Sequence, residues 1–331
     1  MGTDFIISIV GSFIITVLIL RVLIPKLKSL KLGQKILDIG PRWHKSKEGT
    51  PTMGGVSFII AVSLSVAAFF AVELVKGGGD GFTRLLPLLL TYIMALLNGL
   101  IGFFDDRVKL LKKQNEGFSA SQKFLLQLLV AALYIAAMRL TGCITTELAI
   151  PFFGVRVELG IFYYVIALLL ITGIVNSANL TDGIDGLVSS ITLVIMAFFA
   201  VCAFRYSDAG LTVLSGSAIG GMLGFLVYNF HPARVFMGDT GSLFLGGLAV
   251  GCAFLIDNPL IILFAGLIYL IEAMSDIIQV GYYKLTHRRV FLMAPIHHHF
   301  EKCGWSEVKV VAVFSAFTLL TCGIALAAVL L

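Results

Sequence analysis

The chain has 331 residues, of which 58% are hydrophobic and 13% are charged, and its mean hydropathy is +0.99. Water-soluble proteins carry about 25% charged residues, so this composition excludes a soluble globular enzyme and indicates a protein that crosses a membrane several times. The net charge of +5 does not indicate a nucleic-acid partner, because the basic residues gather in the connections between apolar runs.

The apolar runs are continuous and do not alternate, which predicts α-helices rather than a β-barrel. We expect an all-α polytopic membrane protein with about ten transmembrane helices, forming a single integral-membrane domain over residues 1–331. The residues before the first run include no Lys or Arg, so no cleavable signal peptide is expected. The expected spans are 5–25, 53–75, 85–104, 122–141, 160–178, 187–206, 209–229, 241–256, 259–283 and 308–331.

The distribution of basic residues predicts the orientation of these spans. Of the 24 Lys and Arg, 18 lie in alternate connections or at adjoining helix ends, and by the positive-inside rule these connections face the cytoplasm. Both termini are then expected outside. The segment Thr145 to Leu159, with Pro151 and Gly154, predicts a small extracytoplasmic β-hairpin. The cytoplasmic connections are 26–52, 105–121, 179–186, 230–240 and 284–307.

Three further patterns concern structure rather than chemistry. The five cysteines are scattered and indicate neither a disulfide framework nor a zinc site. The ninth span is about 25 residues long, more than a straight crossing needs, so we expect it to tilt or bend. Glycines spaced four apart predict close helix packing in lipid. They are Gly216, Gly220 and Gly224 in one span and Gly247 and Gly251 in the next.

The segment Asn176 to Gly186 is a polar turn between two apolar runs. Its acids Asp182 and Asp185 are each followed by a glycine, which lets a ligand approach the backbone closely. Such a turn could simply cap two helices. However, ionisable groups at membrane depth are usually functional, and other cytoplasmic connections carry similar groups. A functional site is therefore favoured.

The other cytoplasmic connections add acids, lysines and histidines. If the third span continues as a helix past its expected end, Asp105, Lys109 and Lys113 lie on one face. Asp239 stands just before the eighth span, and three consecutive histidines start at His297. Three consecutive histidines cannot all face one point on a helix, so zinc is not favoured. We expect instead a loop whose histidines bind phosphate or sugar.

Five aspartates from three connections can converge only if positive charge holds them together. They are Asp105, Asp106, Asp182, Asp185 and Asp239. Carboxylate oxygens without nearby cysteine favour Mg²⁺ or Mn²⁺ over zinc, although magnesium usually takes one or two carboxylates plus substrate phosphates. With lysines and histidines to bind phosphate, the set indicates phosphoryl transfer.

Five motifs in this order carry a resemblance to a known family. They are Gly49-Thr-Pro-Thr-Met-Gly-Gly55, Asp105-Asp106 with Lys109, Asn179-Leu-Thr-Asp-Gly-Ile-Asp-Gly186, Phe236-Met-Gly-Asp-Thr-Gly-Ser242 and Pro295-Ile-His-His-His-Phe-Glu301. Over nearly its whole length, the chain resembles the phospho-N-acetylmuramoyl-pentapeptide transferases (MraY family), within the polyprenyl-phosphate N-acetylhexosamine-1-phosphate transferase superfamily. The histidine motif and the Pro-Thr-Met-Gly-Gly loop favour this family over its siblings.

The resemblance implies a ten-helix, usually dimeric, Mg²⁺-dependent enzyme of the bacterial plasma membrane. Its active site would face the cytoplasm. It would transfer phospho-MurNAc-pentapeptide from UDP-MurNAc-pentapeptide to undecaprenyl phosphate, giving lipid I and UMP. A polyprenyl-phosphate groove along the ninth span is also implied.

The resemblance also implies roles for individual residues. Asp239 matches the magnesium ligand and Asp105 the proposed base or nucleophile. Asp106, Asp182 and Asp185 match further essential acids, and Lys113, Lys123, His297 and His298 match other catalytic-site positions. The substrate-binding positions, where Phe236 would stack on uracil, are Lys47, Thr52, Asn179, Gly183, Ile184, Asp185, Asn229, Phe236, Gly238 and His299.

Some positions depart from the family, and two other functions stay open. Val313 and Ser315 replace a usual Arg and Trp, and Leu37-Asp38 replaces a common Arg-Glu. A sibling transferase could act on a different UDP-sugar. An ion-coupled transporter is the other alternative, supported by Glu272 and Asp276 within the ninth span, where Asp276 replaces a usual apolar residue.

Overall fold

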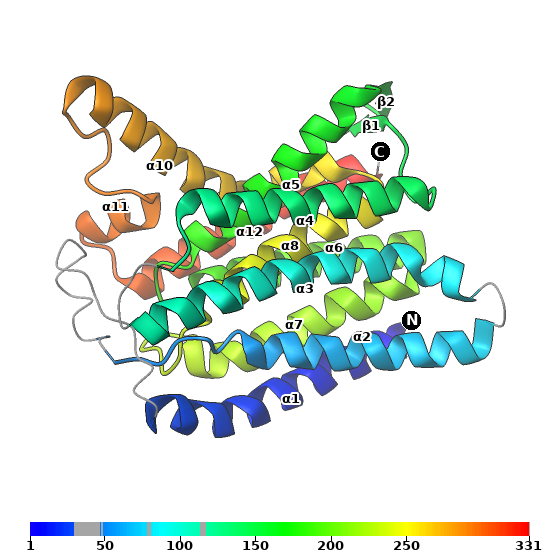
Figure 1. The fold of residues 1–331 in the computed structure, drawn as a ribbon, viewed down its shortest axis with the longest axis horizontal. Helices are drawn as coiled ribbons and strands as arrows, with labels where there is room; N and C mark the ends of the chain where they lie inside the picture. The colour runs from blue at the N-terminus through cyan, green and yellow to red at the C-terminus, as the bar shows by residue number, and fades with distance from the viewer. Residues whose placement is uncertain (30–46, 48, 78–80, 113–116, 331) are drawn as a thin grey trace.

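The computed structural model describes residues 1–29, 47, 49–77, 81–112 and 117–330. Within these ranges the chain is a bundle of long helices with one small sheet, which confirms the all-α polytopic fold (Figure 1). Among the described residues, nine helices are long and apolar enough to cross a membrane, and a bent pair supplies a tenth span.

The long helices are α1 (Gly2–Ser29), α2 (Val56–Gly77), α3 (Gly81–Lys112), α4 (Ala120–Leu140), α5 (Ile161–Thr181), α6 (Leu187–Tyr206), α7 (Ala209–Asn229), α8 (Gly238–Leu255), α10 (Leu267–Thr286) and α12 (Glu307–Leu330). The short elements are η3 (Pro259–Ile261), α9 (Ile262–Ala265), α11 (Ile296–Lys302), β1 (Glu147–Ile150) and β2 (Val155–Glu158).

Three boundaries matter for the site. Helix α3 continues to Lys112, past the expected end of the third span at 104. The expected bend in the ninth span is confirmed, because Pro259–Ala265 and α10 meet at 78°. The expectation of a histidine loop is wrong: these residues form helix α11, which Pro295 introduces from an extended conformation.

The predicted hairpin is confirmed. Strands β1 and β2 pair antiparallel, with Glu147 opposite Glu158, and Arg156 forms an ion pair with Asp257, just beyond α8. Figure 1 shows the hairpin and both chain termini at one end of the bundle, whereas α11 lies at the opposite end. This arrangement matches the expected separation of the two membrane sides.

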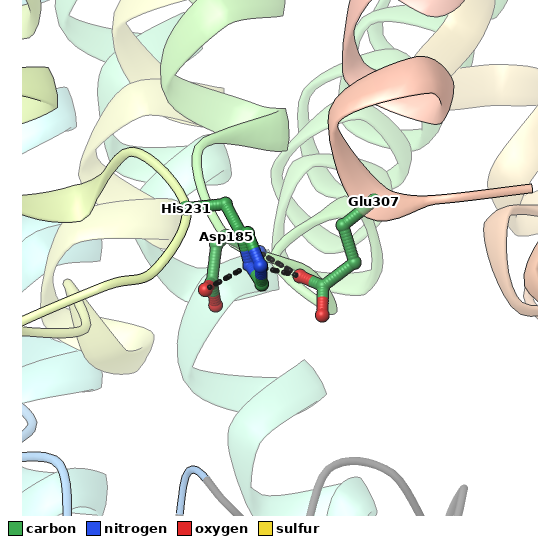
Figure 2. A group of neighbouring side chains, drawn as sticks. All are labelled: Asp185, His231 and Glu307. Carbon is green, nitrogen blue, oxygen red and sulfur yellow. Dashed lines mark hydrogen bonds and ion pairs between the residues drawn. The ribbon is translucent and has the colours of Figure 1, made fainter.

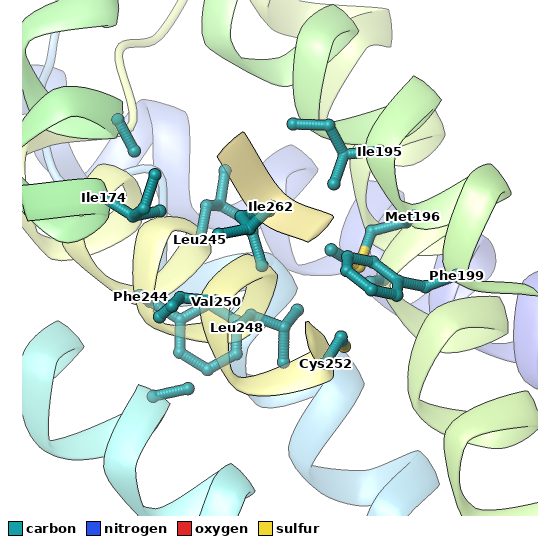
Figure 3. Close-up of a cluster of buried hydrophobic side chains, with 14 of the residues drawn as sticks. Ile174, Ile195, Met196, Phe199, Phe244, Leu245, Leu248, Val250, Cys252 and Ile262 are labelled. Carbon is teal, nitrogen blue, oxygen red and sulfur yellow. The ribbon is translucent and has the colours of Figure 1, made fainter. Parts of the chain in front are cut away.

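Helix α8 is the centre of the bundle and packs against α3 and α5. Its side chains Phe244 and Leu248 belong to the same buried hydrophobic cluster as Ile174 on α5 and Phe199 on α6 (Figure 3). The glycine series pack as predicted. A Cβ on Gly220 would lie 2.1 Å from the carbonyl oxygen of Ile9 on α1. A Cβ on Gly251 would lie 2.5 Å from the Thr91 side chain on α3.

Candidate active site

A cluster of acids and lysines lies where α3, α4 and α5 meet the start of α8. The Asp239 Oδ2 atom is 2.8 Å from the Nζ atoms of both Lys109 and Lys123. Its Oδ1 atom accepts a hydrogen bond of 2.8 Å from the Asn179 amide, whose own oxygen accepts from Lys123 at 3.0 Å. These four residues and Asp105 are called the acid–lysine cluster below.

Asp105 joins this cluster through Lys109. Its Oδ2 atom is 2.7 Å from the Lys109 Nζ, so the predicted pairing of positions four apart on α3 is confirmed. Its Oδ1 atom accepts a hydrogen bond of 2.6 Å from the backbone of Phe118. A Cβ on Gly117 would lie 2.2 Å from this Oδ1, so the approach of the backbone requires a glycine. Lys113 lies outside the described residues.

Asp106 points to a different partner, the first turn of α8. Its Oδ1 accepts from the Asp239 backbone at 3.2 Å, and its Oδ2 accepts from the Thr240 backbone at 3.0 Å and hydroxyl at 2.7 Å. The side chain is buried. Helix N-termini carry free N–H groups and partial positive charge, so a carboxylate there is favourable. Asp106 therefore holds Asp239 in place.

The acid–lysine cluster fits a hard divalent cation. Its donors are the carboxylate oxygens of Asp239 and Asp105, with the Asn179 amide beside them, and oxygen donors of this kind suit magnesium. Two ammonium groups bind one oxygen of Asp239, so a metal ion would take the place of at least one of them there. Asp239, with Asp105 next to it, would hold the ion.

A second group, called the Lys47 network below, lies around Asp185. The Lys47 Nζ is 2.7 Å from Asp185 Oδ1 and 2.6 Å from Glu307 Oε2 at the start of α12. The other Asp185 oxygen is 3.0 Å from His231 Nδ1 (Figure 2). It also accepts a hydrogen bond from the backbone of Ala233. Glu307 Oε2 also accepts from the Asp185 backbone at 3.1 Å.

Asp185, His231 and Glu307 lie close enough to share a metal ion, with their nearest ligand atoms within 4.8 Å of one another. The Lys47 ammonium is paired with both of these carboxylates. Asp239 in the acid–lysine cluster is paired with two ammonium groups, so ion pairing does not distinguish the two groups as metal sites. Neither His231 nor Glu307 was selected as a site residue from the sequence, although each stands in or beside a polar connection between helices.

Asn229 fastens the 182–186 turn to the segment before α8. Its buried side-chain oxygen accepts from the Gly186 backbone at 3.2 Å, and its amide donates to the carbonyl of Val235 at 3.0 Å. Next along the chain, Phe236 pairs through its backbone with Pro51 and Gly54. Three distant segments of the expected nucleoside pocket thus lie together.

Two further expected pocket positions, Gly238 and Thr52, lie close together at the start of α8. Gly238 has a φ of +71°, which favours glycine. A Cβ there would be 2.4 Å from Asp106 Oδ2 and 2.8 Å from the Thr52 hydroxyl. Thr52 therefore lies beside the acid–lysine cluster. Asn179, also expected in the nucleoside pocket, is itself a member of this cluster, where its side chain bonds to Asp239 and Lys123.

Asp182 follows the last residue of α5 and is partly buried. Burial raises the pKa of its carboxyl well above the usual range, and the charges of Asp239, Asp106 and Asp185 raise it further. The next residue, Gly183, is exposed, whereas Ile184 is buried. Asp182 is thus an acid with a raised pKa beside two groups of carboxylates.

The three histidines of α11 face three different partners. His297 Nδ1 is 3.0 Å from Glu272 Oε2, and His298 Nδ1 is 2.6 Å from Glu301 Oε2. His299 Nδ1 accepts a hydrogen bond of 3.1 Å from the backbone of Leu292. Because they diverge, the three do not form a zinc site with one another. Glu272, which supported a transporter, is here the partner of a histidine.

The comparisons with known proteins agree with the motifs. Residues 88–257 match the model of Glycosyl transferase family 4, and residues 47–59 match Phospho-N-acetylmuramoyl-pentapeptide-transferase signature 1. The chain is 45% identical to a phospho-N-acetylmuramoyl-pentapeptide-transferase of Clostridium botulinum, over 91% of this chain and 89% of that one. For the enzyme of that name from Acetivibrio thermocellus the identity is 46%, over 94% and 91%. The chain therefore belongs to the phospho-N-acetylmuramoyl-pentapeptide-transferase family.

Proposed function

We propose that this protein transfers phospho-MurNAc-pentapeptide from UDP-MurNAc-pentapeptide to undecaprenyl phosphate, giving lipid I and UMP. An oxygen of the lipid phosphate attacks the sugar-linked phosphorus of the donor, and the bond between the two phosphates breaks to release UMP. Family membership supports the reaction. The observation that carries the chemistry is the convergence of Lys109 and Lys123 on the Asp239 carboxylate beside Asp105.

The donor binds across the two groups of residues. The nucleoside lies near Lys47 and Asp185, with the Phe236 ring stacked on uracil, and the diphosphate reaches the acid–lysine cluster. When the donor binds, the Lys109 and Lys123 ammonium groups turn partly from Asp239 to the phosphate oxygens, because a diphosphate carries more negative charge than one carboxylate. Further donor contacts are proposed at Thr52, Asn179, Gly183, Ile184, Asn229, Gly238 and His299.

Asp239 would hold a Mg²⁺ ion, which when bound would neutralise negative charge on the transferring phosphate. Asp105 accepts the proton of the acceptor phosphate, or activates that phosphate by position, at its own Oδ2, the oxygen now paired with Lys109. Asp106 keeps the start of α8 in position. Lys113, His297 and His298 contact phosphate or sugar groups of the substrates. Asp182 and Asp185 are the remaining acids of the site.

The acceptor reaches the site along α10. This helix leaves the bundle at an angle in Figure 1 and exposes Ile277 and Ile278, so a polyprenyl chain can lie against it within the hydrocarbon. We place the active site on the cytoplasmic side of the bacterial plasma membrane and both termini outside. The whole chain, 1–331, acts as one transferase domain, and two copies form a homodimer.

The test is UMP release by detergent-solubilised protein from a panel of UDP-sugars with undecaprenyl phosphate. We expect UMP to be released only from UDP-MurNAc-pentapeptide. EDTA should abolish this release, and Mg²⁺ should restore it. Preference for another UDP-sugar would show a sibling transferase. Activity without added metal in EDTA would contradict the magnesium assignment.

A further inference from the structure

The pair formed by Glu272 and His297 joins α10 to α11 in the interior of the protein. Glu272 Oε2 is 3.0 Å from His297 Nδ1 and also lies 3.5 Å from the His297 backbone nitrogen. Both side chains are fully buried. A carboxylate in the middle of a membrane-spanning helix is costly, so a structural or chemical role is expected for it.

The hydrogen on the imidazole ring is determined by this contact. An ionised carboxylate can only accept hydrogen bonds, so the Nδ1 atom that faces it carries the hydrogen. Nε2 is then the ring nitrogen left for another partner. Within the described part of the chain, nothing bonds Nε2 or the second carboxylate oxygen, Oε1, although both atoms are buried. Buried polar atoms without partners are destabilising.

The unpaired nitrogen faces the turn that contains the acids. A Cβ on Gly183 would lie 2.1 Å from His297 Nε2, so the ring edge lies directly against this residue. Gly183 follows Asp182, whose carboxyl lies near the charges of Asp239 and Asp106. The His297 ring is therefore aimed from α11 at the turn between α5 and α6, beside the acid–lysine cluster.

We propose that Glu272 is a positioning residue for His297. It holds the ring against Gly183 and keeps the hydrogen on Nδ1, which leaves Nε2 to accept a hydrogen bond from an O–H or N–H group of the sugar-phosphate donor. Gly183 has no side chain between its backbone and the ring, which lets the turn and Nε2 lie this close together. This inference rests on the proposed transferase function.

The experiment compares Glu272→Gln with Glu272→Asp and with Asp276→Asn, a matched acid one turn further along α10. Gln keeps the shape of Glu, but its amide can donate to Nδ1 and so favour the wrong ring tautomer. Asp keeps the carboxylate but is shorter. We expect Glu272→Gln to lower kcat by about 10–100-fold, with little change in the donor KM or Tm. Glu272→Asp should retain more activity than Glu272→Gln, and Asp276→Asn should stay within about twofold of wild type.

A second measurement separates positioning from packing. Glu272→Gln is combined with His297→Asn, and the double variant should be no slower than His297→Asn alone, because Glu272 acts through His297. If the two losses multiply, or if Glu272→Gln is more active than Glu272→Asp, Glu272 acts through packing and the inference is wrong. The activity of each variant is compared with that of the wild-type protein on whichever UDP-sugar the wild type uses. A wild type that releases no UMP would instead overturn the proposed function.

Discussion

Asp106 on α3 caps the first turn of α8 by accepting hydrogen bonds from both the backbone and the hydroxyl of Thr240, at 3.0 and 2.7 Å. Replacing Asp106 with Ala leaves these buried donors without a partner. We expect a loss of about 1–3 kcal/mol in the free energy of unfolding. Thermal unfolding in detergent measures this loss, and Asp106→Asn, which keeps one acceptor oxygen, should lose less. An unchanged Tm in Asp106→Ala would show that Asp106 does not support α8.

Asp239 and Asp105 should respond differently to pH when each is replaced by Asn. Asp239→Asn should abolish Mg²⁺-dependent turnover at every pH, because the proposed metal ligand is lost. Asp105→Asn should recover part of its activity between pH 7 and 9. A phosphate monoester has its second pKa at about 6, so the acceptor is mostly ionised in this range and needs little help from a base. UMP release across this range measures both variants. An Asp105→Asn variant that binds donor and metal but stays inactive throughout would exclude the proton-accepting role.

Asp182 should make the protein less stable as pH rises. The pKa of its carboxyl is raised in the folded state, whereas an unfolded aspartate has a pKa of about 3.9. Between these two pKa values the native state keeps a proton that the unfolded state has released. Stability therefore falls with increasing pH between about 4 and the raised pKa, and it is unaffected below about 4. Asp182→Asn should raise the Tm at pH 8, with EDTA present, and this gain should disappear toward pH 4.

Glu158 on β2 provides a control of opposite sign. Hydrogen bonds from the Thr146 side chain and the Gly160 backbone lower the pKa of its carboxyl, so its contribution to stability is present above the unfolded pKa and lost as the pH falls. Glu158→Gln should therefore give no gain in Tm at pH 8. A gain in both variants would mean that the Tm responds to net charge rather than to Asp182.

Two native cysteines can test the orientation. Cys143 lies between α4 and the β1–β2 hairpin and is partly exposed, whereas Cys303 follows α11 and is exposed. A membrane-impermeant thiol reagent applied to intact cells should label Cys143, and Cys303 only after the cells are permeabilised. Cys143→Ser and Cys303→Ser identify each signal. Labelling of Cys303 from outside would reverse the topology and remove the cytoplasmic assignment of the active site.

The exposed face of α10 should affect the lipid substrate selectively. Ile277 and Ile278 are 62% and 44% exposed. Ile277→Asp places a charge where the polyprenyl chain is proposed to lie, so the KM for undecaprenyl phosphate should rise more than the KM for the UDP-sugar. Ile277→Leu should leave both constants unchanged. Equal increases in the two constants would indicate a general loss of structure instead.

The sequence predicted most of the fold because membrane spans and helix faces depend on local patterns. Hydropathy located the spans, glycine spacing located the close helix crossings, and Asp105 paired with Lys109 as a continued helix requires. The short helix α11 was missed, because a seven-residue segment has little periodicity and depends on tertiary contacts such as that between Glu272 and His297.

The grouping of site residues was harder to predict than their identity. Five aspartates were expected to converge, but the oxygens of Asp106 bind the start of α8, and those of Asp185 bind Lys47 and His231. Lys47 and Glu307 are 260 positions apart, so no local pattern could reveal their contact. Glu272 suggested ion transport because its partner, His297, lies on another helix and could not be identified from a local pattern.

The α3–α8 crossing has a consequence for inhibitors. A Cβ on Gly102 would lie 2.1 Å from the carbonyl oxygen of Asp239, and a Cβ on Gly238 would lie 2.4 Å from Asp106 Oδ2. Neither position can gain a side chain without displacing the backbone or the acid that holds it. A compound that binds against this crossing would therefore meet a surface that resistance mutations cannot easily reshape. A compound that relies on the exposed side chains of α10 would select resistant variants much more readily.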